Sequence, residues 1–278
     1  MVMTAGTTPR QSIAEAFAQL KQRGRIGLMP FIPAGFPDLE TTQAILPAFQ
    51  RGGASAIEVG IPFSDPIADG PVIQEAFNVA LARKLKLDHI FQMITTVRPN
   101  VSIPLIAMVS YSIVFRYGVD RFAKTARQAG FDGLIVPDLP PPEAQKVCAQ
   151  IRSADLDTIL LVAPTTESER RREIAELCSG FIYYLSVTGI TGERTALPAD
   201  LADNLDQLRT VTDRPIAVGF GISQPQHLAQ LAGHADAAIV GSAFVRVIEK
   251  YAGTPEMESK LEELTRELKT GALQGRMR

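Results

Sequence analysis

Eight short apolar segments recur along the chain, and stretches of helical character separate them. The segments are residues 26–32, 55–61, 104–110, 133–138, 158–164, 181–187, 215–220 and 237–242. They are rich in Ile, Leu, Val and Ala, which is typical of parallel strands covered by helices. Eight strand–helix units close most simply into a (β/α)8 TIM barrel, and an open doubly wound sheet is the alternative.

The length of the chain and the lack of a visible linker favour one domain. Its 278 residues, 46% of them hydrophobic, can bury a large single core. We expect a single barrel domain over residues 1–278, with a disordered tail at 1–9. Residues 10–22 are expected to form an extra N-terminal helix that covers the bottom of the barrel. The last helix, 242–269, is expected to break near residues 253–255.

Several polar residues have the spacing that begins a helix. Asp38 is expected to cap the helix that follows the first strand. Thr166 with Glu169, and Ser223 with Gln226, have the spacing of a capping box, so each pair predicts a helix start.

Charge and cysteine usage exclude several classes of protein. The net charge of −2 gives no overall attraction to nucleic acid or to an anionic membrane. The two cysteines have no metal-type spacing, and the N-terminus lacks the basic start and apolar core of a signal peptide. The longest uncharged stretch, between Arg98 and Arg116, contains a proline and is short for a membrane span. A reduced, cytoplasmic protein is the expected reading.

The stretch EVGIPFSDPIADGP, residues 58–71, places a carboxylate inside a strand. Ile57, Val59 and Ile61 alternate with smaller residues and Glu58, so the two sets face opposite sides of the strand. The bulky set suits the helix layer, which points Glu58 into the barrel. Burial should raise the pKa of that carboxyl, as acid–base chemistry requires. A structural Glu in a buried ion pair is the competing interpretation.

Two aspartates follow in the loop after the second strand. Asp65 and Asp69 lie on the face of a barrel that carries catalytic groups. Asp-Pro and Asp-Gly steps are also ordinary turn chemistry, so either aspartate alone favours a turn role. When the two aspartates are considered together with Glu58, the preference for a turn role over a catalytic role becomes weaker.

Glycines follow three neighbouring strands near the end of the chain. The segments are VTGITGERT, GFGIS and GSAFV, and the last opens a helix. Glycine allows close approach of the backbone to a ligand, and free N–H groups at a helix N-terminus bind phosphate. Although each glycine alone is most simply a turn residue, the three together favour a phosphate site. Nucleotide-binding fingerprints are absent.

The residue types that are missing from the strands exclude two kinds of catalytic mechanism. All eight lysines fall in predicted helices or their flanks, so a Schiff-base mechanism lacks its nucleophile. The histidines, His89, His227 and His234, are expected at the surface and form no metal-type cluster. A phosphorylated substrate, carboxylates for proton transfer and an apolar lining that includes Phe31, Met108 and Phe220 remain.

Together these segments resemble the tryptophan synthase alpha subunit family. The opening stretch is similar to the family's signature, and PFIPAGFPD, GLIVPDLP, YYLSVTGITG, GFGIS and GSAFV agree with it in order and spacing. The resemblance covers roughly residues 10–250. It implies a barrel lyase that cleaves indole-3-glycerol phosphate to indole and glyceraldehyde 3-phosphate.

The resemblance also implies roles for individual residues. Glu58 would be the main acid–base group, Asp69 would contact the indole N–H, and Tyr183 would lie beside the substrate. Thr191 would belong to a lid that contacts Asp69 on closure. The phosphate would be held by the backbone amides of Gly192, Gly221, Gly241 and Ser242.

A partner is implied in the same way. Family alpha subunits pair with a beta subunit in an alpha2-beta2 heterotetramer, and only the beta subunit holds pyridoxal phosphate. The alpha chain itself is expected to need neither cofactor nor metal. Asp65 is then a loop and interface residue. No nucleic-acid or membrane partner is expected.

The sequence departs from the family pattern in two places. In MVSYSIVFRYG, Ser110 replaces a tyrosine, Ser112 an asparagine and Ile113 a proline. These changes affect the pocket wall and the partner-facing loop. Phe36 replaces a frequent aspartate and has no assigned role.

Three other functions stay open at this point. The chain can be a stand-alone lyase that releases indole, a non-catalytic regulatory barrel subunit, or another phosphate-binding barrel enzyme. The intact Glu58, Asp69 and glycine segments argue against the regulatory subunit. Turnover without a partner, and product analysis, separate the others.

Overall fold

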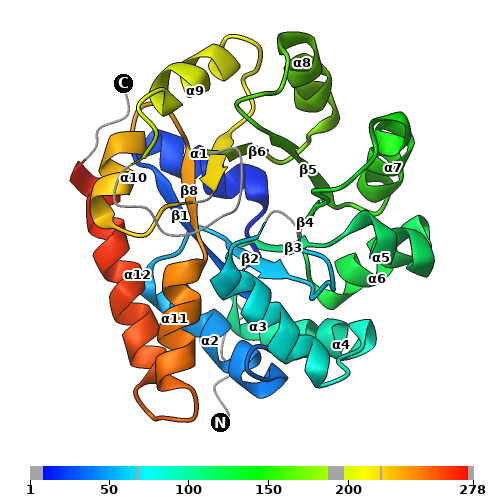
Figure 1. Ribbon diagram of the computed structural model, residues 1–278, viewed down its shortest axis with the longest axis vertical. Coiled ribbons are helices and arrows are strands. Elements are labelled where there is room, and N and C mark those ends of the chain that lie inside the picture. Colours follow the sequence, from blue (N-terminus) through cyan, green and yellow to red (C-terminus); the bar gives the residue numbers. More distant parts are fainter. Residues whose placement is uncertain (1–8, 67–68, 187–196, 220, 275–278) are drawn as a thin grey trace.

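The computed structural model has eight parallel strands that close into a barrel (Figure 1). It describes residues 9–66, 69–186, 197–219 and 221–274, with the side chains of all but the last two. The strands are β1 (Gly27–Pro33), β2 (Ile57–Gly60), β3 (Leu105–Met108), β4 (Gly133–Ile135), β5 (Asp157–Val162), β6 (Ile182–Leu185), β7 (Ile216–Gly219) and β8 (Ala237–Val240). Each pairs with its neighbour in the chain, and β8 closes on β1. The expected (β/α)8 barrel is confirmed, and the open sheet is excluded.

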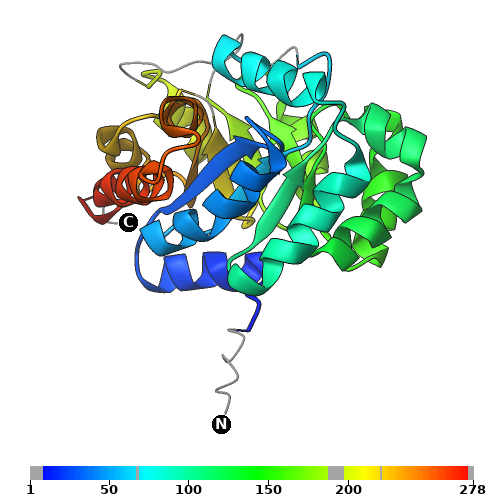
Figure 2. The same ribbon diagram turned by 90° about the horizontal axis from the view of Figure 1, so that it is seen from below.

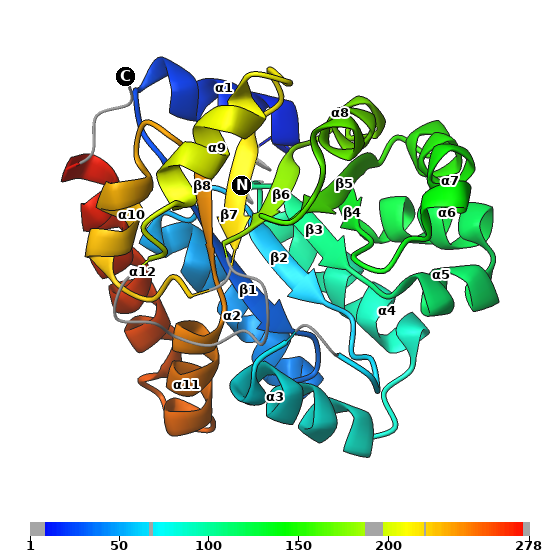
Figure 3. The same cartoon turned by 45° about the horizontal axis from the view of Figure 1, so that its top comes forward.

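Helices surround the barrel on its outer side (Figures 1 and 3). They are α1 (Ile13–Gln22), α2 (Leu39–Gly52), α3 (Pro71–Ala82), α4 (Leu87–Val97), α5 (Tyr111–Tyr117), α6 (Val119–Ala129), α7 (Pro141–Ser153), α8 (Ser168–Leu177), α9 (Leu201–Arg209), α10 (Pro225–Leu231), α11 (Ser242–Tyr251) and α12 (Met257–Gln274), with a 3-10 turn η1 (Arg98–Asn100). No helix within the described ranges is long and apolar enough to cross a membrane.

The local helix signals have mixed outcomes. Asp38 caps α2, accepting a hydrogen bond from the Thr41 N–H at 2.7 Å. Both expected capping boxes are wrong. Thr166 Oγ1 instead accepts from the Ala163 N–H in the preceding turn, and α8 begins at Ser168. The last helix breaks as expected, into α11 and α12.

The helix α10 begins differently because a histidine accepts the backbone hydrogen bond that the capping box would give to Gln226. The Ser223 N–H donates to Nδ1 of His227 at 3.2 Å, and α10 begins at Pro225. The His227 side chain is buried, so its expected place at the surface is wrong. A ring nitrogen that accepts a backbone hydrogen bond can be buried at low cost.

The extra N-terminal helix begins with a capping box of its own. Ser12 Oγ accepts from the Glu15 N–H, and the Ser12 N–H donates to the Glu15 carboxylate at 2.7 Å. The helix lies across one end of the barrel, opposite the end that carries α3 (Figure 2). Ile13 closes the floor, since a Cβ on Gly133 in β4 would lie 2.9 Å from its Cδ1. The expected tail falls mostly on residues 1–8, outside the described ranges.

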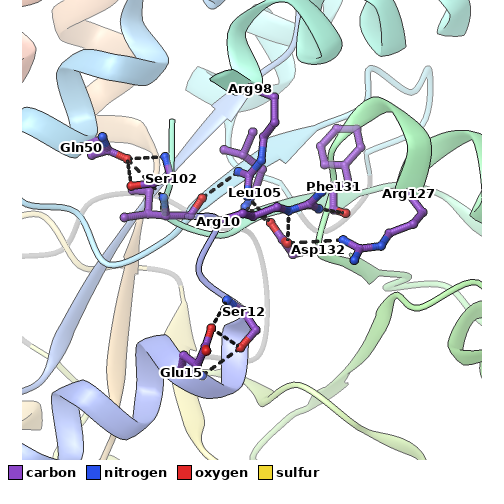
Figure 4. A network of polar contacts seen from close by, with 11 residues as sticks. Arg10, Ser12, Glu15, Gln50, Arg98, Ser102, Leu105, Arg127, Phe131 and Asp132 are labelled. Carbon is purple, nitrogen blue, oxygen red and sulfur yellow. Dashed lines mark hydrogen bonds and ion pairs between the residues drawn. The ribbon is translucent and has the colours of Figure 1, made fainter. Parts of the chain in front are cut away.

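A charged network joins the bottom of the barrel (Figure 4). Asp132, which is 8% exposed, lies just before β4. Its carboxylate pairs with Arg10 at 2.7 Å, Arg98 at 3.1 Å and Arg127 at 3.8 Å. It also accepts a hydrogen bond from the Leu105 N–H at 2.9 Å. One carboxylate therefore joins the N-terminal arm, the segment after α4, α6 and β3.

Candidate active site

Glu58 lies on β2 with its side chain directed into the barrel. Its strand neighbours in register are Phe31 on β1 and Ile106 on β3. Ile57 and Val59 face the helix layer and are fully buried there. Glu58 itself is 0% exposed. The charge of Glu58 acts on Tyr183 of β6, across the barrel from β2, which supports the inward orientation predicted from alternation.

Within the described part of the chain, no ion pair compensates the buried carboxyl group. Neither Glu58 oxygen has a hydrogen-bond partner among the described residues. Burial raises the pKa of Glu58 well above its ordinary value, and the neighbouring Asp69 raises it further. The competing interpretation, a Glu in a buried ion pair, therefore finds no support here. A neutral carboxyl at pH 7 is what an acid catalyst requires.

Asp69 lies in the loop between β2 and α3. Its N–H donates to the Pro66 carbonyl at 3.0 Å, and its own carbonyl accepts from the Gln74 side-chain amide at 2.7 Å. Gly70 and Pro71 follow as the N-cap and first residue of α3, which fixes the loop's exit. Burial raises the pKa of Asp69 to about 6.

Tyr183 lies on β6, close enough to Glu58 and Asp69 for their charges to act on its hydroxyl. Its pKa is raised well above the ordinary value, first by burial and then by the charges of Glu58 and Asp69. A Cβ added to Gly219 on β7 would lie 2.3 Å from the Tyr183 hydroxyl oxygen. Gly219 therefore makes room for this phenol, and a larger residue would displace it.

Phe31 forms an apolar wall beside Glu58. A Cβ on Gly60 would lie 2.8 Å from its ring, and one on Gly241 would lie 3.0 Å from it. Phe77 of α3 meets the ring edge-to-face, with centroids 6.3 Å apart. Glycines on β2 and after β8 therefore let this ring stand between them.

Backbone donors lie after β7 and β8. Gly241 is the N-cap of α11, and Ser242 is its first residue. The first N–H in this turn with an intrahelical acceptor is that of Val245, so those before it remain available to an anion. Gly221, after β7, has φ +78°, a conformation suited to glycine.

The remaining predicted positions divide into those inside and outside the described ranges. Met108 ends β3, pairs with Gly60 in register and is half-buried. Asp65 is exposed, and Ser64 donates to its carboxylate at 2.9 Å. Thr191, Gly192 and Phe220 lie outside the described residues.

Ser110, one of the departures from the family pattern, has a defined structural role. It caps α5, and its hydroxyl donates to the Asp138 carboxylate at 2.7 Å. The Tyr111 N–H donates to the same carboxylate at 2.7 Å, and Ser112 Oγ lies 2.9 Å from Ser110 Oγ. These bonds join the segments after β3 and β4.

Gly60 and Gly219 have a role in the pocket that sequence reasoning did not assign, although it placed Gly60 on the inward face and Gly219 in the GFGIS segment. Both end a strand, and both face the pocket because they make room for an aromatic ring. In a strand, every second side chain faces the same side, so Gly60 faces inward like Glu58, and Gly219 faces the same side as Ala217. A glycine at such a position indicates that another group approaches the strand closely.

The raised pKa of Asp69 predicts how stability depends on pH. An acid whose folded pKa lies above its unfolded value destabilises the fold once pH rises through that window, here from about 4 to about 6. We expect Asp69→Asn to be more stable than the wild type above pH 6, by on the order of 1 kcal/mol. Urea unfolding at pH 5 and pH 8 measures this, with Asp65→Asn as the control on the same loop. Equal pH dependence in all three proteins would contradict it.

The arrangement can perform one kind of chemistry well. A carboxyl whose pKa is raised well above its ordinary value and a second carboxyl with a pKa of about 6 lie beside an apolar wall and a phenol. Free backbone amides follow at a helix N-terminus. Among the described residues no group of acidic, histidine or cysteine side chains could hold a metal, and all eight lysines lie outside the strands.

Comparison with known proteins agrees with this arrangement. Residues 17–273 match the family model described as tryptophan synthase alpha chain. The tryptophan synthase alpha chain of Rhodopirellula baltica is 50% identical over 242 residues, 86% of each chain. That of Methanosarcina acetivorans is 47% identical over 268 residues, 95% of each chain.

Solved structures show the same fold. A Mycobacterium tuberculosis tryptophan synthase structure has a TM-score of 0.85 and 33% identity, covering 95% of this chain and 99% of that one. A variant of the Pyrococcus furiosus alpha-subunit has a TM-score of 0.80 and 34% identity, covering 87% and 97%. The chain therefore belongs to the tryptophan synthase alpha chain family, whose alpha reaction is a lyase activity.

Proposed function

We propose that this chain cleaves indole-3-glycerol phosphate into indole and glyceraldehyde 3-phosphate. The observation that carries the proposal is Glu58, a fully buried carboxyl directed into the barrel without a partner among the described residues. A structural role gives no reason to keep such a group, because burying an unpaired carboxyl is costly. Family membership supplies the substrate class.

The two carboxyls divide the work because their environments differ. Asp69 loses its proton at about pH 6, and its negative charge then helps to hold the proton on Glu58. Asp69 is therefore the carboxyl of the pair whose pKa lies near neutrality, and Glu58 is the one that burial and Asp69 both drive toward the protonated form. Two titratable groups with separated pKa values are suited to opposite roles in one reaction.

In the proposed reaction Glu58 first gives up a proton and later takes one up, so it ends in the protonation state in which it began. Glu58 donates a proton to C3 of the indole, and the ring nitrogen takes up positive charge that the Asp69 carboxylate stabilises. The bond from C3 to the side chain then breaks and its electron pair returns to the ring. The hydroxyl on the departing carbon loses its proton to the Glu58 carboxylate and becomes the aldehyde. Neither a lysine nor a metal is required.

The other predicted residues are proposed to hold the two ends of the substrate. Phe31, Met108, Tyr183 and Phe220 contact the indole, where an apolar lining excludes water and strengthens the electrostatic effect of the acids. The phosphate is held by the amides of Gly192, Gly221, Gly241 and Ser242. Thr191 is proposed to contact Asp69 when the site closes.

We further propose that a beta subunit docks on the rim formed by the segments after β2 and β3. A groove of about 470 Å³ lies there, lined by residues that include Phe63, Leu85, Ile113 and Tyr117. Phe115 on α5 is 66% exposed, an unusual position for a large apolar side chain. The proposed assembly is an alpha2-beta2 heterotetramer in the cytoplasm, in which the beta subunit carries pyridoxal phosphate and the alpha chain itself needs no cofactor.

The partner assignment predicts the effect of a charge on this rim. Phe115→Asp is expected to weaken activation by the beta subunit at least tenfold, because it places an unpaired charge in an apolar contact. The activity of the isolated chain should stay within twofold of wild type. Titrating the beta subunit against each variant measures this, with Lys124→Gln, an exposed change on α6, as control. Unchanged half-activation by Phe115→Asp would contradict the proposed surface.

Product analysis tests the proposed function. The purified chain is incubated with indole-3-glycerol phosphate, with and without a beta subunit, and indole and triose phosphate are quantified. Equal amounts of both products support the lyase. Fast release without the partner favours the stand-alone lyase, and absence of both products under either condition overturns the proposal.

A further inference from the structure

A small cavity lies at the bottom of the barrel, away from the acids. Its volume is about 180 Å³, and α1, the turn between α2 and β2, and α12 contribute to its lining. A water molecule occupies about 30 Å³ in the liquid, so the cavity has room for a tetrahedral oxyanion and a few waters.

Three cationic side chains line this cavity, and none of its described lining residues is a carboxylate. They are Arg23 and Arg25, from the turn after α1, and Lys269 from α12. The other polar lining residues, Ser55 and two glutamines, can also donate hydrogen bonds. None of the three cations has an ion pair with a described residue. Arg23 and Arg25 are exposed, and Lys269 is half-buried.

Hydrogen bonds of the backbone fix the turn that carries the two arginines, and a glycine makes room for the lysine. The N–H groups of Arg23 and Arg25 both donate to the Leu20 carbonyl, at 3.2 and 3.0 Å. Lys269 lies across Gly53, since a Cβ there would be 2.5 Å from Nζ. Gly53 has φ +96°, so glycine serves both the turn and the lysine. The ammonium group is therefore placed against the backbone and not extended into solvent.

The Lys269 ammonium is the least favourably placed of the three charges. Partial burial lowers the pKa of Lys269, and the charges of Arg25 and then Arg23 lower it further. A cation at the C-terminal end of α1 interacts favourably with the helix dipole, and this explains a positive charge at Arg23 without any ligand. That reason does not extend to Lys269, which lies more than a turn before the end of α12.

We infer that the cavity lined by Arg23, Arg25 and Lys269 binds a phosphate-type oxyanion. The anion joins α1, the turn after α2 and α12 through charge-assisted hydrogen bonds. It binds at the opposite end of the barrel from the substrate, so its occupancy stabilises the fold without competing for the active site. This site is separate from the backbone amides proposed for the substrate phosphate.

Inorganic phosphate titrated into the full chain tests the inference by nuclear magnetic resonance. The amide signals of Gly53 and Ser55 are expected to shift with a saturable dependence on phosphate, and not with chloride at matched ionic strength. Signals of Gly241 and Ser242 report the active site separately, so a failure at one site does not affect the other. Lys269→Gln should weaken binding at Gly53 at least tenfold.

Matched variants make the result decisive. Lys269→Arg keeps the charge and should retain binding within about threefold, and Lys124→Gln removes an exposed lysine elsewhere and should change nothing. The inference is overturned if the Gly53 and Ser55 signals stay fixed in the wild type or move equally with chloride. Unchanged affinity in Lys269→Gln also overturns it.

Discussion

Replacing Glu58 with glutamine should lower kcat for indole release by about 10² to 10⁴-fold, the range that proton transfer by a positioned group supplies. The substitution keeps the size of the side chain and removes only its ability to donate and accept a proton. Substrate binding uses other groups, so KM should change little, and kcat/KM should fall with kcat. Steady-state assays in the presence of a beta subunit measure both constants.

Stability separates a chemical effect from a folding effect in this variant. Because the wild-type carboxyl is buried and unpaired, Glu58→Gln is expected to be no less stable than wild type at pH 8. Lys124→Gln, which changes an exposed side chain on α6, serves as the activity control. A Glu58→Gln protein that folds normally and retains kcat within twofold would exclude Glu58 as the acid–base group.

Replacing Asp132 with alanine should lower the free energy of unfolding by about 3 to 5 kcal/mol, the usual cost of removing one partner from a buried charge network. Arg98 would suffer most, because burial already lowers the pKa of its guanidinium to about 10 and Asp132 opposes that change. The Leu105 N–H would also lose its acceptor. Urea unfolding followed by circular dichroism measures the change.

A surface carboxylate in an ion pair provides the control for this substitution. Glu258 pairs with Arg51 at 2.9 Å, and both side chains are nearly half exposed. Glu258→Ala should cost less than about 1 kcal/mol, since solvent screens such pairs. Equal losses for Asp132→Ala and Glu258→Ala would mean that the bottom network contributes no more than a surface pair.

The strands were predictable because their signal is local. Each is a continuous apolar segment, and parallel strands in a barrel are buried on both faces, so hydrophobicity alone locates them. The inward direction of Glu58 followed in the same way, from alternation with Ile57 and Val59. Strand ends were overestimated by one to three residues in several segments, because the apolar run continues into the loop beyond the last ladder bond.

The polar contacts that fix the fold were not predictable from local patterns. Asp132 gathers Arg10, Arg98 and Arg127 from three separate parts of the chain, and none of the four carries a local motif. The predicted cap at Ser223 failed for a similar reason, because a neighbouring side chain, His227, was the better partner for the backbone. Propensity describes what a residue can do alone, and tertiary contacts decide among these options.

The site itself was predicted in part. Its acids followed from their place at the end of a strand, but the roles of Gly60 and Gly219 depend on which aromatic ring lies opposite each. That information exists only once β1 is beside β2 and β6 is beside β7. Glycine in a strand therefore indicated close approach without identifying what approaches.

The central claim is that burial keeps Glu58 neutral so that it can deliver a proton. The infrared spectrum of wild type minus Glu58→Gln at pH 7 tests this directly, because protonated and ionised carboxyls absorb at different frequencies. The account predicts a protonated carboxyl band at pH 7 that is absent from the variant and disappears only at higher pH. A carboxylate band at pH 7 that titrates near the ordinary glutamate value of about 4.3 would contradict it.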